Sequence, residues 1–149
     1  MPKRRKKTEK QKLKEKLWEL CKTIVRKRDG NTCFICGKGP LAGGGWHTGH
    51  LIPSSTCGGY LRYDLRNLHS SCYNCNINLG GNGAKFARRV EEVYSKEFLD
   101  SIFADLNHFQ KTDVLFFKEK IEEYKPLTEL SKEELIEHTK KIYEDKTTC

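Results

Sequence analysis

The sequence predicts an α+β fold in which a small core is flanked by N- and C-terminal helices. Apolar residues recur at helical spacing before residue 30 and again after residue 82, whereas glycines and other turn residues separate short apolar runs between them. The chain has 149 residues and is 36% hydrophobic, so it can bury only a modest core. We therefore divide it into residues 1–30, a basic arm and a helix, residues 31–82, the core, and residues 83–149, a helical region.

The helices are predicted from their apolar faces and from signals at their ends. The first helix should end before Gly30, which stands at the expected C-terminal cap. Pro126 should end a later helix, and Ser131 with Glu134 forms a capping box that opens the last one. The apolar faces are formed by Leu13, Leu17, Leu20 and Ile24, by Phe86, Val90, Val93 and Tyr94, and by Val114, Phe117, Ile121 and Tyr124.

The formal net charge of +8 is concentrated near the N-terminus. Residues 1–28 carry +10, residues 29–81 carry +1, and residues 82–149 carry −3. A basic arm of this kind suits a polyanion such as nucleic acid, although a solvated, partly disordered tail has the same composition. The arm residues that we assign to nucleic-acid binding are Lys3, Arg4, Arg5, Lys6 and Lys7.

The sequence also indicates a compartment. It has no run long and apolar enough to span a membrane, and no apolar signal core follows the first positive charges. We therefore expect a soluble, cytoplasmic protein with no membrane partner and with reduced thiols. The paired spacing of its cysteines favours metal binding over a secreted disulfide framework.

Four of the seven cysteines form two pairs, Cys33 and Cys36 in "CFIC" and Cys72 and Cys75 in "CYNC". A gap of two residues lets both thiolates of a pair face one ion, so the two pairs predict a tetrahedral, structural Zn²⁺ site. Iron–sulfur ligation is a weaker alternative because nothing else in the sequence indicates electron transfer. The remaining cysteines are expected as unpaired thiols: Cys21, on the buried side of the first helix, Cys57 and Cys149.

The segment around and between the cysteine pairs predicts strand, loop, strand and helix. It resembles the HNH family of endonucleases, whose ββα-metal core has a His at the end of its first strand, an Asn in its second, and a His or Asn after the last zinc cysteine. His50 in "GHLIP", Asn67 in "RNLHSSC" and Asn76 in "CYNCN" match these three positions. The match covers roughly residues 33–78.

A narrower resemblance covers more of the chain. The run "TGHLIPSSTCGGYLRYDLRNLHSSCYNCNINLGGNGAKF" is similar to the NinG (Rap) family of phage recombination proteins, and so is the preceding "LWELCKTIVRKRDGNTCFICG". This resemblance implies a structure-selective DNA endonuclease, a phosphodiester hydrolase acting on branched recombination intermediates such as Holliday junctions. The endonuclease VII class of phage resolvases, which also has a zinc-clamped ββα-metal fold, points the same way. For a phage-encoded protein the expected location is the host cell cytoplasm.

The chemistry of phosphodiester hydrolysis assigns roles to the matched residues. The reaction needs an activated water, neutralisation of the phosphate charge and stabilisation of the departing 3′ oxygen. A neutral imidazole is a suitable base, so we assign this role to His50. Asn76 offers an uncharged oxygen to a hard cation such as Mg²⁺. Asn67 is better placed to hydrogen-bond the loop that carries His50 than to contact substrate.

One position departs from the HNH pattern. Many HNH enzymes have an acidic metal ligand just before the base, where this chain has Gly49. His47 lies two residues earlier on the same strand face and is a candidate replacement ligand, as is His69, which shares a strand face with Asn67. An imidazole ligand shifts the metal preference towards Mn²⁺ without excluding Mg²⁺. For each histidine a structural role is the alternative.

Further basic residues are candidate DNA contacts. A guanidinium beside the second strand suits bidentate binding of the scissile phosphate, and basic residues on the next helix suit the DNA backbone. An ordinary solvated surface is the alternative for these side chains. The candidates are Arg62 and Arg66 beside the strand, and Lys85, Arg88 and Arg89 on the helix.

Three functions follow from these observations. The leading one is a metal-dependent endonuclease acting on branched DNA, with zinc as structural ion and Mg²⁺ or Mn²⁺ as catalytic ion. A generic HNH nicking or restriction nuclease acting on duplex DNA is the second. The third is a non-catalytic, zinc-stapled DNA-binding module. This alternative remains because Gly49 stands where many HNH enzymes have an acidic metal ligand. Because resolving a four-way junction needs two symmetric incisions, we also expect a homodimer.

Overall fold

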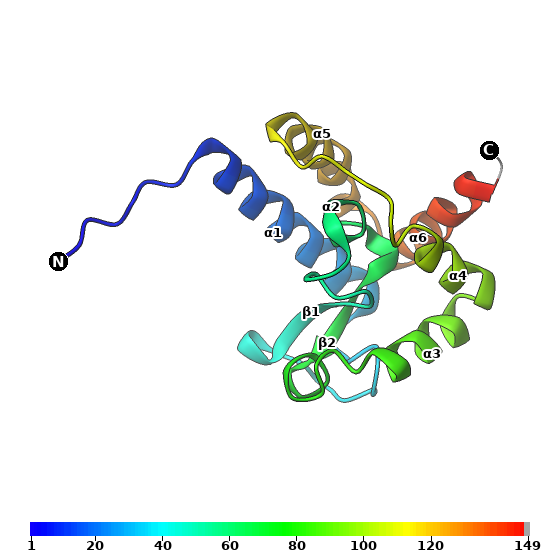
Figure 1. Ribbon diagram of the computed structural model, residues 1–149. Helices are drawn as coiled ribbons and strands as arrows, with labels where there is room; N and C mark the ends of the chain where they lie inside the picture. Colours follow the sequence, from blue (N-terminus) through cyan, green and yellow to red (C-terminus); the bar gives the residue numbers. More distant parts are fainter. Residues whose placement is uncertain (148–149) are drawn as a thin grey trace.

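The computed structural model describes residues 1–147, and the side chains of residues 1–144. Cys149, expected as an unpaired thiol, lies outside this range. The α+β fold class is confirmed, because the helices surround a small two-stranded sheet (Figure 1). In chain order the elements are α1 (Glu9–Asp29), β1 (Trp46–His50), α2 (Gly58–Arg62), β2 (Leu68–Cys72), a π-helical turn (Asn74–Asn78), α3 (Gly83–Val93), α4 (Lys96–Ala104), α5 (Val114–Tyr124) and α6 (Lys132–Thr147).

The sheet pairs β1 with β2 in antiparallel register. His47 lies opposite Ser71, and Gly49 lies opposite His69. The predicted order of strand, loop, strand and helix is therefore present, and the loop carries the short helix α2. Among the described residues β1 pairs with no strand other than β2, and its Trp46 carbonyl accepts from Arg26 Nη2 of α1 at 2.9 Å.

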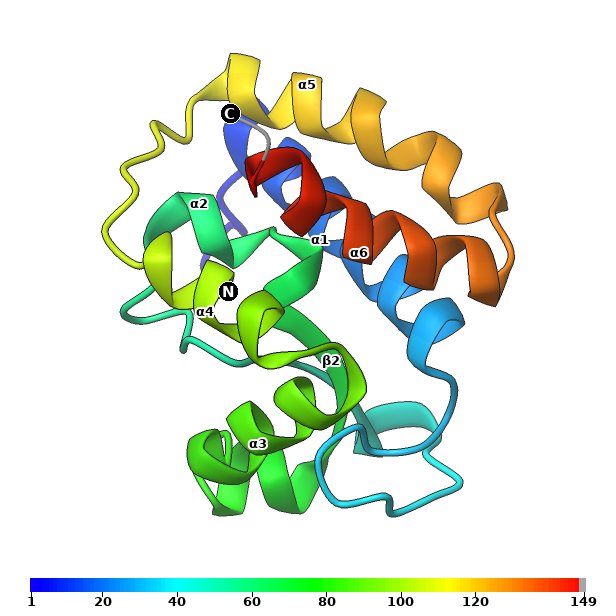
Figure 2. The same ribbon diagram turned by 90° about the vertical axis from the view of Figure 1, so that its right-hand side faces the viewer.

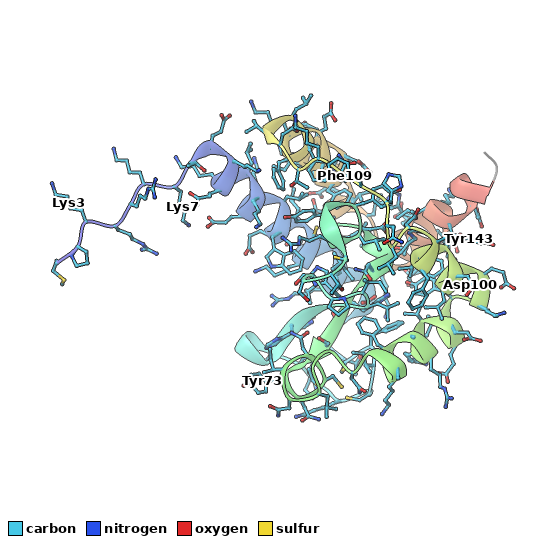
Figure 3. All side chains as sticks on the ribbon, viewed as in Figure 1. Lys3, Lys7, Tyr73, Asp100, Phe109 and Tyr143 are labelled. Carbon is cyan, nitrogen blue, oxygen red and sulfur yellow. The ribbon has the colours of Figure 1, made fainter. Side chains whose placement is uncertain are left out.

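Helix α1 begins and ends where its local signals place it. Thr8 is the N-terminal cap, and it exchanges side-chain and backbone hydrogen bonds with Gln11 in a capping box. Gly30 follows the last turn with a φ of +74°, a left-handed value that glycine adopts without strain. Before α1 the basic arm extends away from the body of the protein (Figures 1 and 3).

Two apolar cores stabilise the fold. In one, α1 packs against α5 and α6, as Figure 2 shows, and Cys21 is completely buried there as predicted. In the other, α3 and α4 cover the cysteine-bearing loops and β2 through Phe86, Val90, Phe98 and Ile102. Together these cores fix both ends of the sheet against helices.

The C-terminal helices show which sequence signals were sufficient. Helix α5 ends just before Pro126, and Ser131 and Glu134 form the predicted capping box of α6. Val93 corrects the predicted apolar face of α3, because its side chain is 42% exposed at the end of that helix. Helix α4, which Ser95 caps, was not predicted.

No described helix has both the length and the apolar character needed to cross a membrane.

A buried ion pair at the end of α1 connects several elements. Arg28 Nε lies 2.7 Å from Asp29 Oδ1, and both side chains are buried. Arg28 also donates to the carbonyl oxygens of Leu65 and Leu68, and it contacts Thr139 Oγ1 of α6 at 3.3 Å. The pair therefore joins α1 to the start of β2 and to the last helix.

Asp29 continues this network into the sheet. Its Oδ2 accepts from the backbone N–H of Ser70 at 3.0 Å and lies 3.1 Å from His69 Nδ1. Burial opposes ionisation of this carboxyl, but Arg28 and His69 hold the pKa of Asp29 well below its usual range. Asp29 is therefore ionised and needs its guanidinium partner.

We expect Arg28→Ala to lower the free energy of unfolding by about 3–5 kcal/mol, because it leaves the Asp29 carboxylate buried without its partner. Urea denaturation followed by circular dichroism measures this loss. Lys125→Ala is the control, because Lys125 pairs with Glu122 at an exposed site and should cost less than about 1 kcal/mol. Equal losses for the two variants would show that the buried pair is not a structural centre.

Candidate functional site

The four paired cysteines meet at one point. Their Sγ atoms all lie within 4.8 Å of one another, and those of Cys36 and Cys72 are 3.7 Å apart. A tetrahedral Zn²⁺ with Zn–S bonds of about 2.3 Å requires sulfur atoms about 3.8 Å apart. The residues therefore fit a structural zinc ion, which would be held by Cys33, Cys36, Cys72 and Cys75.

Local backbone geometry brings these thiols together. After the first pair, Gly37 has a φ of +78° and its N–H donates to the Cys33 carbonyl at 2.9 Å, which closes the turn. The second pair lies at the end of β2 and in the π-helical turn, where the Cys75 N–H points at Cys72 Sγ. Burial opposes ionisation, but hydrogen bonds from Cys75 and the neighbouring thiols lower the pKa of Cys72 to about 7. Burial raises the pKa of Cys33 and Cys75, so Cys72 is the thiol of these three that ionises most readily.

Asn67 holds the loop that follows β1. Its Oδ1 accepts from the Ile52 N–H at 2.7 Å, and its Nδ2 donates to the carbonyl oxygens of Ile52 and Leu61, both at 3.1 Å. The side chain is completely buried. Asn67 thus makes the loop contact expected from the sequence, and it fixes the chain directly after His50.

His50 is held in one orientation at the end of β1. Its Nε2 lies 3.0 Å from the carbonyl oxygen of Arg62, and its ring stacks on Trp18 at a centroid distance of 5.4 Å and an angle of 6°. Because a carbonyl only accepts, Nε2 carries the proton and Nδ1 is the basic nitrogen. Burial lowers the pKa of His50 below its ordinary value, so the ring is neutral near pH 7.

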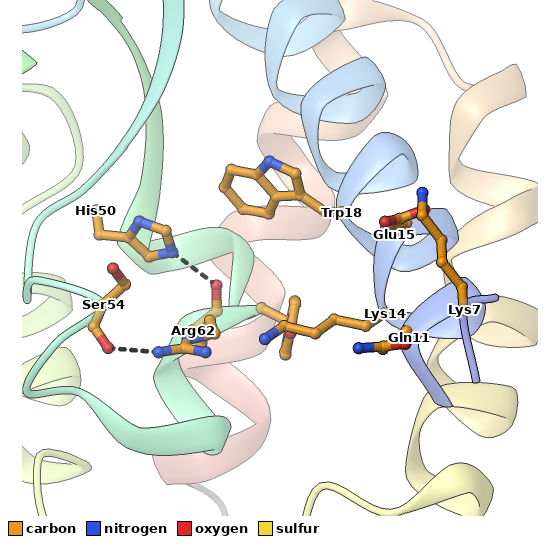
Figure 4. A pocket seen from close by; sticks show the side chains of 9 residues that line it. Lys7, Gln11, Lys14, Glu15, Trp18, His50, Ser54 and Arg62 are labelled. Atoms are coloured by element: carbon orange, nitrogen blue, oxygen red, sulfur yellow. Dashed lines mark hydrogen bonds and ion pairs between the residues drawn. The ribbon is translucent and has the colours of Figure 1, made fainter. Parts of the chain in front are cut away.

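A basic cavity of about 550 Å³ opens beside His50 (Figure 4). Arg62, Lys7 and Lys14 line it, and Glu15 is the acidic residue of its wall. Arg62 is anchored because its Nη2 donates to the Ser54 carbonyl at 2.7 Å. Because Lys7 pairs with Glu15 at 2.8 Å, an anion entering this cavity meets the uncompensated charges of Arg62 and Lys14 next to a neutral imidazole.

A second polar group lies on the other face of β1. His47 Nε2 lies 2.9 Å from the Gly44 carbonyl, so Nε2 carries the proton and Nδ1 accepts from Asn76 Nδ2 at 2.9 Å. A Cβ atom at Gly49 would lie 2.9 Å from Ser71 Oγ and 3.3 Å from Asn76 Oδ1. The buried Ser71 hydroxyl has no hydrogen-bond partner among the described residues. Gly49 therefore leaves a small cradle lined by neutral oxygen atoms.

These geometries separate the predicted catalytic residues into two sets. His50 faces α1, whereas His47 and Asn76 face the side of the π-helical turn, because neighbouring residues of a strand point to opposite faces. The structure brings His47, Asn76 and Gly49 together. Asn67 supports the loop between the sets and lines neither.

The position of His69 corrects its assignment as a ligand of the catalytic metal. The ring is completely buried, stacks on Phe34 at 3.9 Å, and uses Nδ1 to contact Asp29 and Arg28. It thus belongs to the buried ion-pair network. A ring enclosed by Phe34 and Phe86 has no path to the substrate.

Arg66 also corrects its assignment as a phosphate-binding residue. Its side chain is 0% exposed and pairs with Asp64 at 2.6 Å and Asp105 at 2.8 Å. It also donates to Ser101 Oγ at 3.0 Å. With two carboxylates bound, Arg66 fixes the loop before β2 to α4, and its complete burial keeps it from contacting DNA.

The remaining basic candidates lie on the surface of α3 and in the arm. Lys85 and Arg88 are exposed, as are residues 3–7. Arg89 is exposed but also donates to the Phe34 carbonyl at 3.1 Å, so it supports the first cysteine loop. Lys7 forms an ion pair with Glu15 of α1, in which Nζ lies 2.8 Å from Oε2.

Three residues near the candidate site were not identified from the sequence. Neither Trp18 nor Lys14 belongs to a motif that indicates the site, although the Trp18 ring lies against His50 and Lys14 lines the cavity. Ser71 had no distinguishing signal. Only the strand register, which places Ser71 opposite His47, reveals its position.

Among known protein families, the one described as bacteriophage lambda NinG protein matches residues 2–134. No curated protein and no solved structure matches the chain significantly. The match includes α1, both strands, the four clustered cysteines and the start of α6.

If the thiol cluster binds structural zinc, the purified protein should carry about one tightly held Zn²⁺ per chain, and Cys72→Ser should lose both the metal and the folded state. Elemental analysis and circular dichroism measure these two properties. Cys57→Ser is the matched control, because Cys57 is a buried thiol outside the cluster, and it should keep the metal. A folded wild-type protein without bound metal would contradict the assignment.

Proposed function

The chain belongs to the bacteriophage lambda NinG family, and from this premise we propose that it is a metal-dependent HNH-type endonuclease. Its proposed reaction is hydrolysis of phosphodiester bonds in branched recombination intermediates, including Holliday junctions. Membership of this family favours a role in phage recombination. The observation that carries the enzymatic part is the oriented, neutral His50 at the wall of a basic cavity.

His50 is the proposed general base. Donation from Nε2 to the Arg62 carbonyl fixes the tautomer, and the lone pair on Nδ1 takes the proton of the attacking water. The buried environment keeps the ring in its neutral form near pH 7. Asn67 contributes by holding Ile52, two residues beyond His50, and so it acts as a positioning residue.

The cavity cations are proposed to bind the DNA phosphates. Arg62 is anchored through Ser54, so its guanidinium is pre-oriented towards an anion beside His50. Lys14 adds positive charge to the same wall, and Lys7 compensates the charge of Glu15 there. This arrangement neutralises the phosphate before water attacks it, which the reaction requires.

The cradle beside Gly49 is the proposed site of the divalent cation. Asn76 Oδ1 and Ser71 Oγ, which has no hydrogen-bond partner among the described residues, are hard oxygen donors. His47 Nδ1 would become a third ligand by giving up the hydrogen bond that it accepts from Asn76 Nδ2. A Mg²⁺ or Mn²⁺ ion held by these residues would stabilise charge on the departing 3′ oxygen. The donors are all neutral, so the phosphate itself would supply the negative charge.

The two sets of residues are proposed to act on one phosphodiester from the two faces of β1. Among the described residues β1 is an edge strand, and Gly49 leaves room for a ligand on the face that Asn76 lines. A DNA strand lying along this edge is approached by His50 from the α1 side and by Asn76 from the other. The general base and the metal ligands would thus reach the phosphodiester from opposite sides.

His50→Ala should lower the rate of cleavage of a four-way junction at least a hundredfold, roughly the contribution of a general base, while fold and DNA affinity are retained. Gel-based cleavage with added Mg²⁺ or Mn²⁺ measures the rate, and fluorescence anisotropy measures binding. His108→Ala is the control, since that histidine is half-exposed and lies against Tyr60.

A comparison of branched and linear DNA substrates distinguishes the proposed function from its two alternatives. Each protein is assayed on a four-way junction and on linear duplexes of the same sequence. Equal rates on both would favour a generic HNH nuclease. Binding without metal-dependent cleavage by the wild-type protein would favour a non-catalytic DNA-binding module, and undiminished cleavage by His50→Ala would refute the assigned base.

His47→Ala should raise the metal concentration needed for half-maximal cleavage, because it removes a ligand of the proposed cation site. His47→Asp should partly restore cleavage with Mg²⁺, since a carboxylate suits that ion better than an imidazole. Titration of Mg²⁺ and Mn²⁺ at fixed junction concentration tests both variants. An unchanged metal requirement in His47→Ala would give His47 a structural role only.

A further inference from the structure

A second hollow extends the cavity beside His50 along helix α1. It has a volume of about 220 Å³ and lies between α1 and α2. The two hollows meet at Lys14, Arg62 and Tyr63, which line both of them. The two hollows therefore lie side by side along α1, and we call them together the α1–α2 groove.

The charges of the groove indicate an extended polyanion. Lys7 and Lys14 line the hollow beside His50, and Lys10 lines the second one. Lys10 and Lys14 are one helical turn apart, about 6 Å along the axis, so they can contact successive phosphates of one strand. Glu15 is the acidic residue of this lining, and Lys7 already neutralises it at 2.8 Å.

The size and aromatic lining of the groove favour a single strand over a duplex. A hollow of about 550 Å³ has the size of a pocket for a small organic ligand, which suits one or two nucleotides. Trp18 lies in its wall, and unpaired bases stack on such rings whereas paired bases are hidden inside the duplex. The groove also begins at His50, where the proposed function places the scissile phosphate.

We propose that the α1–α2 groove binds single-stranded DNA, namely the unpaired strand that adjoins the scissile phosphate in a branched substrate. This proposal rests on the proposed function for the position of the cut. It assigns to Lys10, Lys14 and Trp18 a direct role in selecting branched DNA. The strand runs from His50 past Arg62 towards the N-terminal turns of α1.

Charge reversal on α1 tests the groove. Fluorescence anisotropy without added divalent metal measures the affinity for a twelve-residue oligo-dT, a splayed fork with dT arms, and a blunt duplex. Lys14→Glu should weaken binding to oligo-dT and to the fork about tenfold, and to the duplex less than about twofold. Lys12→Glu is the matched control, because it makes the same charge change on α1 outside both linings and should affect all three alike. Equal effects of the two variants on the fork would overturn the proposal.

Trp18 provides a local readout that a general charge effect would not move. The chain has two tryptophans, so Trp46→Phe leaves Trp18 as the sole emitter. Oligo-dT should quench this emission, and the blunt duplex should not. Absence of quenching at saturating oligo-dT would overturn the proposal, as would equal quenching by the duplex.

These binding measurements are independent of catalysis. A protein that fails to cleave any DNA but shows the Lys14-dependent binding and the quenching refutes the nuclease proposal and supports the groove. Suppose instead that the wild-type protein cleaves junctions, His50→Ala does not, and Lys14→Glu binds the fork as tightly as the wild type. This outcome refutes the groove proposal alone.

Discussion

The buried pair of Arg28 and Asp29 is the interaction on which the arrangement of the site depends. The pair lies where α1 ends, and its hydrogen bonds reach the start of β2, the sheet backbone and α6. Because both ions are removed from water, each is stable only while the other is in place. The network therefore sets where α1 crosses the sheet, and so where Trp18 and Lys14 lie relative to His50.

The candidate site combines residues that support its loops with residues that are available for chemistry. The thiol cluster, Asn67 and the Arg66 pairs fix the loops on both sides of β1 and β2 without contacting substrate. The groups available for chemistry lie on or beside β1. Such a division suits an enzyme for a large, flexible polymer, because the substrate adapts to the protein while the reacting groups stay in position.

Much of the fold was predictable because its signals are local. Helix ends are defined at Gly30, Ser131 and Glu134 by contacts with residues only three or four positions away. The spacing of the cysteine pairs is likewise visible in the sequence. Helix α4 was missed because its short apolar pattern follows α3 after a break of only two residues, so that one face runs into the next.

The roles of Arg66 and His69 were unpredictable for the opposite reason. Arg66 pairs with Asp64 two residues away, but its second carboxylate, Asp105, lies 39 residues away, and the Asp29 carboxylate that contacts His69 lies 40 residues away. Sequence patterns show that a residue is basic or can bind a metal, but burial is decided by which distant segment packs against it. His50 and Asn76 were located from motif positions, whereas their separation onto two faces of β1 follows from strand geometry.

The crowding around Gly49 couples three positions of this fold. A Cβ atom at position 49 would lie 2.9 Å from Ser71 Oγ and 3.3 Å from Asn76 Oδ1, so a carboxylate there requires the Ser71 hydroxyl to rotate away or residue 71 to change. The acidic ligand of many HNH enzymes and the present Ser71 and Asn76 conformations therefore compete for the same space. A new ligand at 49 would also reposition Asn76, and with it the hydrogen bond to His47.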